Sequence, residues 1–124
     1  MYKIVSFWTA PRPQDVEAFE EYYENAHGPM AGRLPGLLKF ESCRTAGTGD
    51  ALPAFYRVAE LYFEDQAAME AATTTREWTE MYEDAGFIIK RFGVTLQSGS
   101  GVAVEEQLTP GGPRPALVDQ LRAR

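Results

Sequence analysis

Residues 55–63 read FYRVAELYF, which is the clearest β-strand in the chain. Successive side chains of a strand point to opposite faces of its sheet. In this strand one side carries Leu61 and Phe63, and the other carries Tyr56, Val58 and Tyr62. An antiparallel sheet with one face in water shows apolar residues on one side only. The segment therefore predicts a sheet whose two faces are both covered.

Three further strands are predicted, two before this one in the sequence and one after it. They are residues 2–9 (YKIVSFWT), 37–45 (LLKFESCRT) and 102–108 (VAVEEQL). The loop at residues 46–54 is rich in glycine and small residues, as expected of a connection between adjacent strands. Ser98 to Gly101 is predicted to be a loop that precedes the last strand.

Two helical regions separate these strands. Apolar residues recur at steps of three and four from Val16 onward, which predicts a helix that Gly28-Pro29 ends. Asp65 is a suitable cap for a second helix. The run Thr73-Thr74-Thr75 interrupts this region, which resumes at Arg76. Residues 87–92 (FIIKRF) either extend this helix to an end between Phe87 and Phe92, as we prefer, or begin a strand. The order β-α-β-β-α-β predicts an α+β, ferredoxin-like domain: a four-stranded antiparallel sheet with helices on one face.

Helices on one face leave the second face of the sheet bare. About six large apolar side chains remain there, each worth ~1.5–3 kcal/mol when it leaves water. The sum, roughly 10 kcal/mol, rivals the stability of an ordinary domain. We therefore predict a symmetric homodimer in which two sheets pack together. The alternative is that a tail or an extended loop covers the face.

Composition restricts the class of protein. The chain has 124 residues, 44% of them hydrophobic, and suits one domain. A net charge of −6, with 12 basic residues among 18 acidic ones, argues against nucleic acid as a partner. Neither a secretory signal nor an apolar run of ~20 residues is present, so we expect a cytoplasmic protein with no membrane partner. Residues 109–124 form a Pro/Gly-rich tail that either docks weakly or is a mobile end.

Four segments of the chain form a recognisable set: FEEYYENAHGPM (residues 19–30), LPGL (34–37), AELYF (59–63) and VAVEE (102–106). Together they resemble the EthD family of the dimeric α+β barrel superfamily. The resemblance spans residues 1–108 and leaves the 109–124 tail outside; residues 10–13 depart from it, since they lack the paired basic residues often seen there. It implies a homodimeric barrel with a pocket between sheet and helices in each subunit. Members of the superfamily include cofactor-free oxygenases, polyketide cyclases, isomerases, decarboxylases, dehydratases and haem-degrading enzymes, so the fold restricts geometry more than chemistry.

His27 is the only histidine in the chain and the first candidate for catalysis. It lies one turn after Tyr23, at the border of the apolar stripe of the first helix. Imidazole titrates near neutral pH and so suits a general acid or base. The alternative is a histidine that binds the last carbonyl groups of the helix. The resemblance favours the catalytic role, because a histidine at this place is typical of EthD-like proteins.

Other side chains are candidates for the same site. Glu60 lies in the middle of a strand, where it either pairs with a neighbouring base such as Arg57 or Arg44, or orients His27 as a second catalytic residue. Four aromatic residues are predicted to line the ligand pocket, although core packing also explains the last three: Phe7, Tyr23, Trp78 and Tyr82. Cys43 is either a nucleophile or, as we prefer, a passive strand residue.

The side chains that could serve as metal ligands are too few for a structural zinc site. One histidine and one cysteine cannot supply the four nitrogen and sulfur ligands of structural zinc. Haem ligation by His27 is the remaining alternative, and we expect no cofactor and no metal. The expected function is a small enzyme that acts on an apolar aromatic or polyketide-like ligand, as a cyclase, dehydratase, isomerase or decarboxylase. The alternatives are a cofactor-free monooxygenase and a non-catalytic module that binds a hydrophobic ligand.

Overall fold

The computed structural model describes residues 1–124 and confirms the predicted order of elements. The strands are β1 (Tyr2–Trp8), β2 (Lys39–Arg44), β3 (Arg57–Phe63) and β4 (Leu96–Val102). The α-helices are α1 (Val16–Tyr22), α2 (Gly28–Ala31), α3 (Gln66–Ala72), α4 (Arg76–Phe92) and α5 (Ala116–Arg122). A 3-10 turn, η1 (Pro13–Asp15), precedes α1, and a π-helical turn, η2 (Tyr23–His27), joins α1 to α2.

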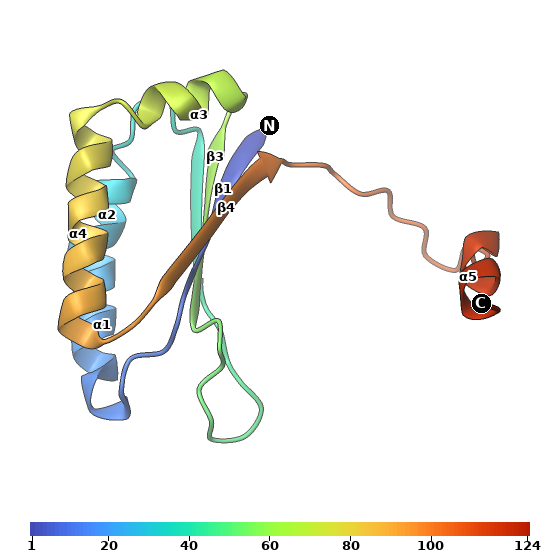
Figure 1. The fold of residues 1–124 in the computed structure, drawn as a ribbon, viewed down its shortest axis with the longest axis horizontal. Coiled ribbons are helices and arrows are strands. Elements are labelled where there is room, and N and C mark those ends of the chain that lie inside the picture. Colours follow the sequence, from blue (N-terminus) through green and yellow to red (C-terminus); the bar gives the residue numbers. More distant parts are fainter.

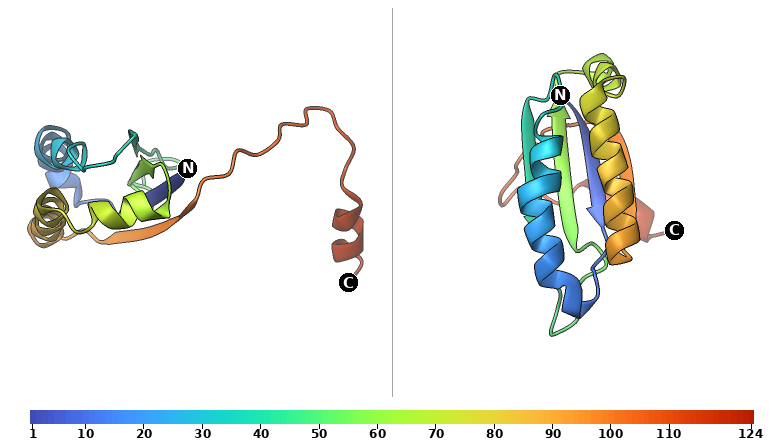
Figure 2. Two further views of the ribbon diagram at one scale, coloured as in Figure 1. Left: turned by 90° about the horizontal axis from the view of Figure 1, so that it is seen from above. Right: turned by 90° about the vertical axis from the view of Figure 1, so that its left-hand side faces the viewer.

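The four strands form one antiparallel sheet in the order β2-β3-β1-β4. Helices α1, α2 and α4 lie on one face of this sheet, and the opposite face is bare (Figure 1, Figure 2). This arrangement is the predicted α+β, ferredoxin-like fold. The side chains of Ile4, Ser6 and Trp8 in β1 point toward the helices, so those of Lys3, Val5 and Phe7 point to the bare face.

The first helix does not end at Gly28-Pro29, so that prediction was wrong. The chain instead passes through η2, in which the Gly28 N–H donates to the Tyr23 carbonyl, and continues as α2 to Ala31. Proline has no N–H to donate, and a π-turn rearranges the hydrogen bonds of the helix around it. A Cβ at Gly28 would lie 3.1 Å from the Tyr23 oxygen, so the turn favours a glycine there. π-turns occur frequently at functional sites, and this one carries His27.

The second helical region follows the prediction. Asp65 caps α3 by accepting a hydrogen bond from the Ala68 N–H at 2.8 Å. The three threonines separate α3 from α4, and Thr75 caps α4. Helix α4 ends at Phe92, and Gly93 follows in the left-handed conformation with φ of 66°. This turn directs the chain back toward the sheet.

The last strand was predicted at residues 102–108 and instead spans Leu96–Val102. Ser98 to Gly101, predicted to be a loop, lie inside it and pair with β1 from Trp8↔Leu96 to Tyr2↔Val102. The sequence LQSGSGV has few apolar side chains, so its strand character arises from backbone pairing with β1 rather than from a hydrophobic pattern.

Tyr56 also departs from the prediction. It lies just before β3 and is fully buried against Phe19, with ring centroids 5.7 Å apart, on the helix side of the sheet. The strand alternation that would have placed it beside Val58 begins only at Arg57. The bare face therefore carries four half-buried apolar side chains: Val5, Phe7, Val58 and Tyr62.

Residues 103–124 leave the sheet on the side of the bare face and run away from it, ending in α5 (Figure 2). Leu117 and Leu121 of α5 are more than half exposed, with fractions of 59% and 55%. The tail thus does not cover the bare face of its own sheet. None of the helices in this structure combines the length and the apolar character needed to cross a lipid bilayer.

Candidate functional site

The π-turn η2 directs His27 toward the sheet, where the residue is 94% buried, with an exposed fraction of 6%. Its ring meets the Trp8 indole of β1 edge to face, with centroids 5.5 Å apart and an interplanar angle of 86°. The Tyr23 ring also lies 5.5 Å from the imidazole and meets the Trp8 indole, with centroids 6.3 Å apart. Two aromatic neighbours thus fix the orientation of the imidazole.

Asp84 of α4 completes the contacts of this imidazole. The distance between His27 Nδ1 and Asp84 Oδ2 is 2.8 Å, and both side chains are less than 10% exposed. A carboxylate accepts hydrogen bonds, so Nδ1 carries the proton. The other carboxylate oxygen, Oδ1, accepts a hydrogen bond from the Tyr22 hydroxyl. The three side chains form a continuous Tyr22–Asp84–His27 network between the first helix and α4.

The network sets the protonation of its members. Burial lowers the pKa of His27 from 6.5, and the hydrogen bond and charge of Asp84 oppose this effect only in part. The imidazole is therefore neutral at pH 7, with a free electron pair on Nε2. The hydrogen bond to Asp84 raises the pKa of the Tyr22 hydroxyl to about 12, so this group stays protonated and remains a donor.

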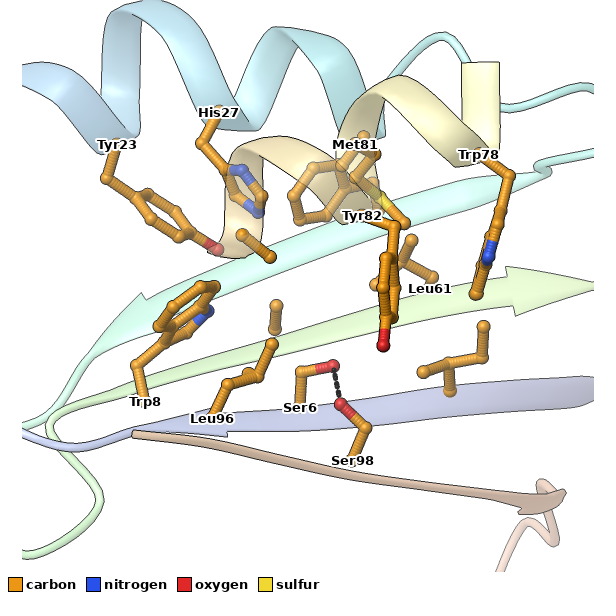
Figure 3. Close-up of a pocket in the computed structure, with 15 residues that line it drawn as sticks. Ser6, Trp8, Tyr23, His27, Leu61, Trp78, Met81, Tyr82, Leu96 and Ser98 are labelled. Atoms are coloured by element: carbon orange, nitrogen blue, oxygen red, sulfur yellow. Dashed lines mark hydrogen bonds between the residues drawn. The ribbon is translucent and has the colours of Figure 1, made fainter. Parts of the chain in front are cut away.

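A pocket of about 190 Å³ lies between the sheet and the helices beside His27 (Figure 3). Twelve of its fifteen lining residues are hydrophobic. His27 Nε2 makes no hydrogen bond within the chain and is the ring nitrogen left for a molecule in this space. An apolar cavity on the order of 150 Å³ holds a benzene molecule, so this pocket has room for one ring with a short substituent.

Three of the four aromatic residues predicted for the pocket are in its wall: Tyr23, Trp78 and Tyr82. Phe7 is not, and this prediction requires correction. Its ring lies on the bare face of the sheet against Phe55, with centroids 5.0 Å apart. Since neighbouring residues of β1 alternate between faces, Phe7 cannot share a face with Trp8.

Glu60 does not meet His27 either. It pairs with Val5 in the sheet and shares its face, and its carboxylate binds Lys3 Nζ at 2.9 Å. The sheet thus lies between Glu60 and His27, and the predicted contact is not formed. The predicted pairing of Glu60 with a neighbouring base is formed, but the base is Lys3. Arg57 and Arg44, named as its candidate partners, project to the helix side, where both meet Glu20. Cys43 lies opposite Val58 on the bare face, where it is exposed.

Arg57 packs against Tyr23, one of the residues that line the pocket. The residue is 97% buried, with an exposed fraction of 3%, and its guanidinium binds Glu20 and Glu24, the latter at 3.1 Å. The same group lies 4.2 Å from the centroid of the Tyr23 ring. Arg57 thereby fixes Tyr23, which in turn contacts His27.

Asp84 and Tyr22 were missed by the sequence analysis. Taking ~100° per residue, Asp84 borders the apolar stripe of α4 formed by Met81, Ala85 and Ile88. An acidic residue at the border of an apolar stripe was the one feature of the sequence that could have indicated Asp84 as a site residue. No group of three or more His, Cys, Asp or Glu side chains comes together in this structure as a metal site would require.

The sequence matches the model of the EthD domain over residues 11–89. The chain belongs to the EthD family. An uncharacterised 11.0 kDa protein from the thcB-thcC intergenic region of Rhodococcus erythropolis is 29% identical over 77 residues, covering 62% of this chain and 73% of that protein. These comparisons confirm the family that the sequence resembled.

Solved structures agree with this membership. An EthD family protein from Bacillus halodurans superposes with a TM-score of 0.66 at 29% identity, over 86% of this chain and 99% of that one. SnoaB from Streptomyces nogalater, a cofactor-independent oxygenase, superposes with a TM-score of 0.57 at 16% identity, over 85% and 94% of the two chains. At that identity the second likeness establishes the ferredoxin-like fold alone.

Proposed function

We propose that this EthD protein is a small enzyme in which His27 Nε2 moves a proton to and from a small apolar substrate of about one ring, aromatic or polyketide-like. The observation that carries the proposal is the buried hydrogen bond between His27 Nδ1 and Asp84, at 2.8 Å, behind a pocket that the imidazole lines. A base oriented by a carboxylate, beside a space for a reacting molecule, is the arrangement that general acid–base catalysis requires.

The contacts of His27 define its part in the reaction. As Nε2 takes a proton, the ring becomes an imidazolium, and the adjacent carboxylate of Asp84 stabilises this charge. Tyr22 holds the second carboxylate oxygen and limits the rotation of Asp84. The lowered pKa of His27 keeps the ring neutral, and therefore basic, before the substrate arrives.

The lining restricts the substrate. Trp8, Leu61, Trp78 and other hydrophobic residues favour a ring system over a charged metabolite. Removal of a proton next to a carbonyl or ring system begins a cyclisation, dehydration or isomerisation, in which His27 returns the proton to the product. In the decarboxylation of a neutral carboxylic acid, Nε2 takes the carboxyl proton, the C–C bond breaks to release carbon dioxide, and the imidazolium returns that proton to the carbon left behind.

A cofactor-independent monooxygenase is the second candidate. Its support is the likeness of the fold to SnoaB. In that reaction His27 deprotonates the substrate, and the resulting anion itself supplies the electrons that reduce molecular oxygen. Oxygen uptake during turnover distinguishes this candidate from the redox-neutral reactions.

The decisive experiment measures proton transfer directly. An aromatic ketone such as acetophenone exchanges the acidic protons of its methyl group for deuterium when a base removes them, and NMR follows the exchange in D₂O. We expect the protein to accelerate this exchange and His27→Ala to abolish the acceleration while the ketone still binds. Equal rates for the two proteins would favour a non-catalytic module that binds a hydrophobic ligand.

We also propose that the protein acts as a homodimer through the bare face of the sheet. Val5, Phe7, Val58 and Tyr62 lie there, and the Lys3–Glu60 pair places both signs of charge beside them. A two-fold axis brings the same surface of a second copy onto this face, so apolar side chains meet apolar ones. The tail leaves on the same side and does not compete for the surface (Figure 2).

A further inference from the structure

The wall of the pocket that faces His27 carries a group of hydroxyls. Ser6 of β1 and Ser98 of β4 are paired residues in the sheet, both line the pocket, and their hydroxyl oxygens are 2.9 Å apart. The Tyr82 side chain extends from α4 toward the sheet, with its hydroxyl at the sheet end (Figure 3). Between this wall and His27 the lining is apolar, so the pocket has two polar ends.

The serine pair always retains a hydrogen-bond donor. Each hydroxyl has one hydrogen, and the bond between Ser6 and Ser98 uses only one of the two. Whichever serine donates, the other keeps an O–H for a molecule in the pocket. This end of the pocket therefore suits an acceptor oxygen.

The acceptor that fits best is uncharged. No lysine or arginine is among the fifteen residues that line the pocket. A carboxylate placed there would lose hydration without gaining a positively charged partner. A carbonyl oxygen needs only the hydroxyl donor that the serine pair supplies.

We propose that Ser6 and Ser98 form a subsite for the carbonyl oxygen of a neutral aromatic ketone whose acidic C–H faces His27. The orientation toward His27 rests on the proposed function. When Nε2 takes the proton, the electron pair of the C–H bond forms the C=C bond of an enolate, and the carbonyl oxygen gains the negative charge. The serine O–H then donates to this oxygen more strongly than to the ketone.

Binding of two probes of the same shape tests the subsite. In α-methylstyrene a CH₂ group replaces the carbonyl oxygen of acetophenone. Trp8 and Trp78 are the two tryptophans of the chain and both line the pocket, so their indole N–H signals in NMR report binding. We expect acetophenone to bind about fivefold more tightly, as one uncharged hydrogen bond predicts. Ser6→Ala/Ser98→Ala should remove this preference and leave α-methylstyrene affinity unchanged.

The chain offers a matched control and a fallback variant. Ser100→Ala alters a serine two residues along the same strand that binds the Tyr2 hydroxyl and does not line the pocket, so the preference should persist. If the double variant does not fold, Ser6→Cys/Ser98→Cys, kept reduced, replaces both hydroxyls with weakly donating thiols of similar size and should reduce the preference.

Two results would overturn the subsite. One is equal affinity of the wild-type protein for both probes, and the other is an equal loss for both probes in the serine variants. Benzoate binding more tightly than acetophenone would likewise contradict an uncharged acceptor. The His27→Ala variant should retain the preference for acetophenone, because binding needs no proton transfer. Failure of the subsite and failure of the proposed base therefore give different results.

Discussion

His27 in the π-turn and Asp84 in α4 are 57 positions apart in the sequence, and their side chains meet through a buried hydrogen bond of 2.8 Å. The bond connects the two helices that cover the pocket. It also determines which nitrogen of the imidazole faces the substrate, so its removal should alter catalysis more than binding.

Replacing the carboxylate tests this role. In Asp84→Asn the amide can donate to Nδ1, which would move the imidazole proton to Nε2 and remove the base. We expect the rate of deuterium exchange in acetophenone to fall by about 10²–10⁴, as in other His–Asp pairs, with little change in affinity. Glu83→Gln, an exposed neighbour on α4, is the control and should keep the wild-type rate. Parallel losses of rate and affinity would instead indicate a structural role for Asp84.

The pKa of His27 predicts a dependence on pH. Since burial lowers the pKa from 6.5, the rate should rise with pH through a value below 6.5 and then reach a plateau. Stability has the same sign, because the unfolded chain binds the proton more readily than the folded one. This contribution is complete above pH 6.5 and is lost as the pH falls through the folded pKa. His27 is the only histidine, so one imidazole titration in NMR measures the value, and a pKa above 6.5 would refute the account.

Replacement of Glu60, unlike that of Asp84, should leave catalysis unchanged. Its carboxylate lies on the bare face with Lys3, separated from the pocket by the sheet. Glu60→Gln should therefore leave the exchange rate within about twofold of the wild-type value, since a half-buried ion pair on the far face of the sheet does not touch the pocket. A loss as large as that expected for Asp84→Asn would restore Glu60 to the catalytic site.

These residues also show what the sequence could establish. The alternation in β1 placed Phe7 and Trp8 on opposite faces, but both faces are apolar, so the pattern did not reveal which one receives the helices. Asp84 stands at the border of a helical stripe, yet its partner depends on how α4 lies against the π-turn, which is a tertiary property. His27 was found because it is unique and because the surrounding segment resembles EthD proteins.

Two glycine substitutions, one at the π-turn and one in α4, test whether the turn requires a glycine. In Gly28→Ala the new Cβ would lie 3.1 Å from the Tyr23 carbonyl, so the turn must shift and move His27. We expect a loss of about 1–3 kcal/mol in the free energy of unfolding and a slower exchange reaction. Gly86→Ala places a methyl group in open space inside α4 and should stabilise the protein by about 0.5–1 kcal/mol. Urea denaturation compares the two, and equal stability of both variants would show that the turn tolerates a side chain.

The proposed dimer depends on the bare face, where Val58 lies opposite Phe7 on the two central strands of the sheet. Wild-type chains of 13.8 kDa should sediment at twice that mass at micromolar concentrations. An aspartate within a closed interface would be buried without a partner, so Val58→Asp should sediment as a single chain with an unchanged circular dichroism spectrum. Leu38→Asp places the same charge at an exposed residue of the opposite parity, and it should remain dimeric. A wild-type monomer, or a Val58→Asp dimer, would mean that water or another molecule covers this face, because the tail of the chain runs away from it.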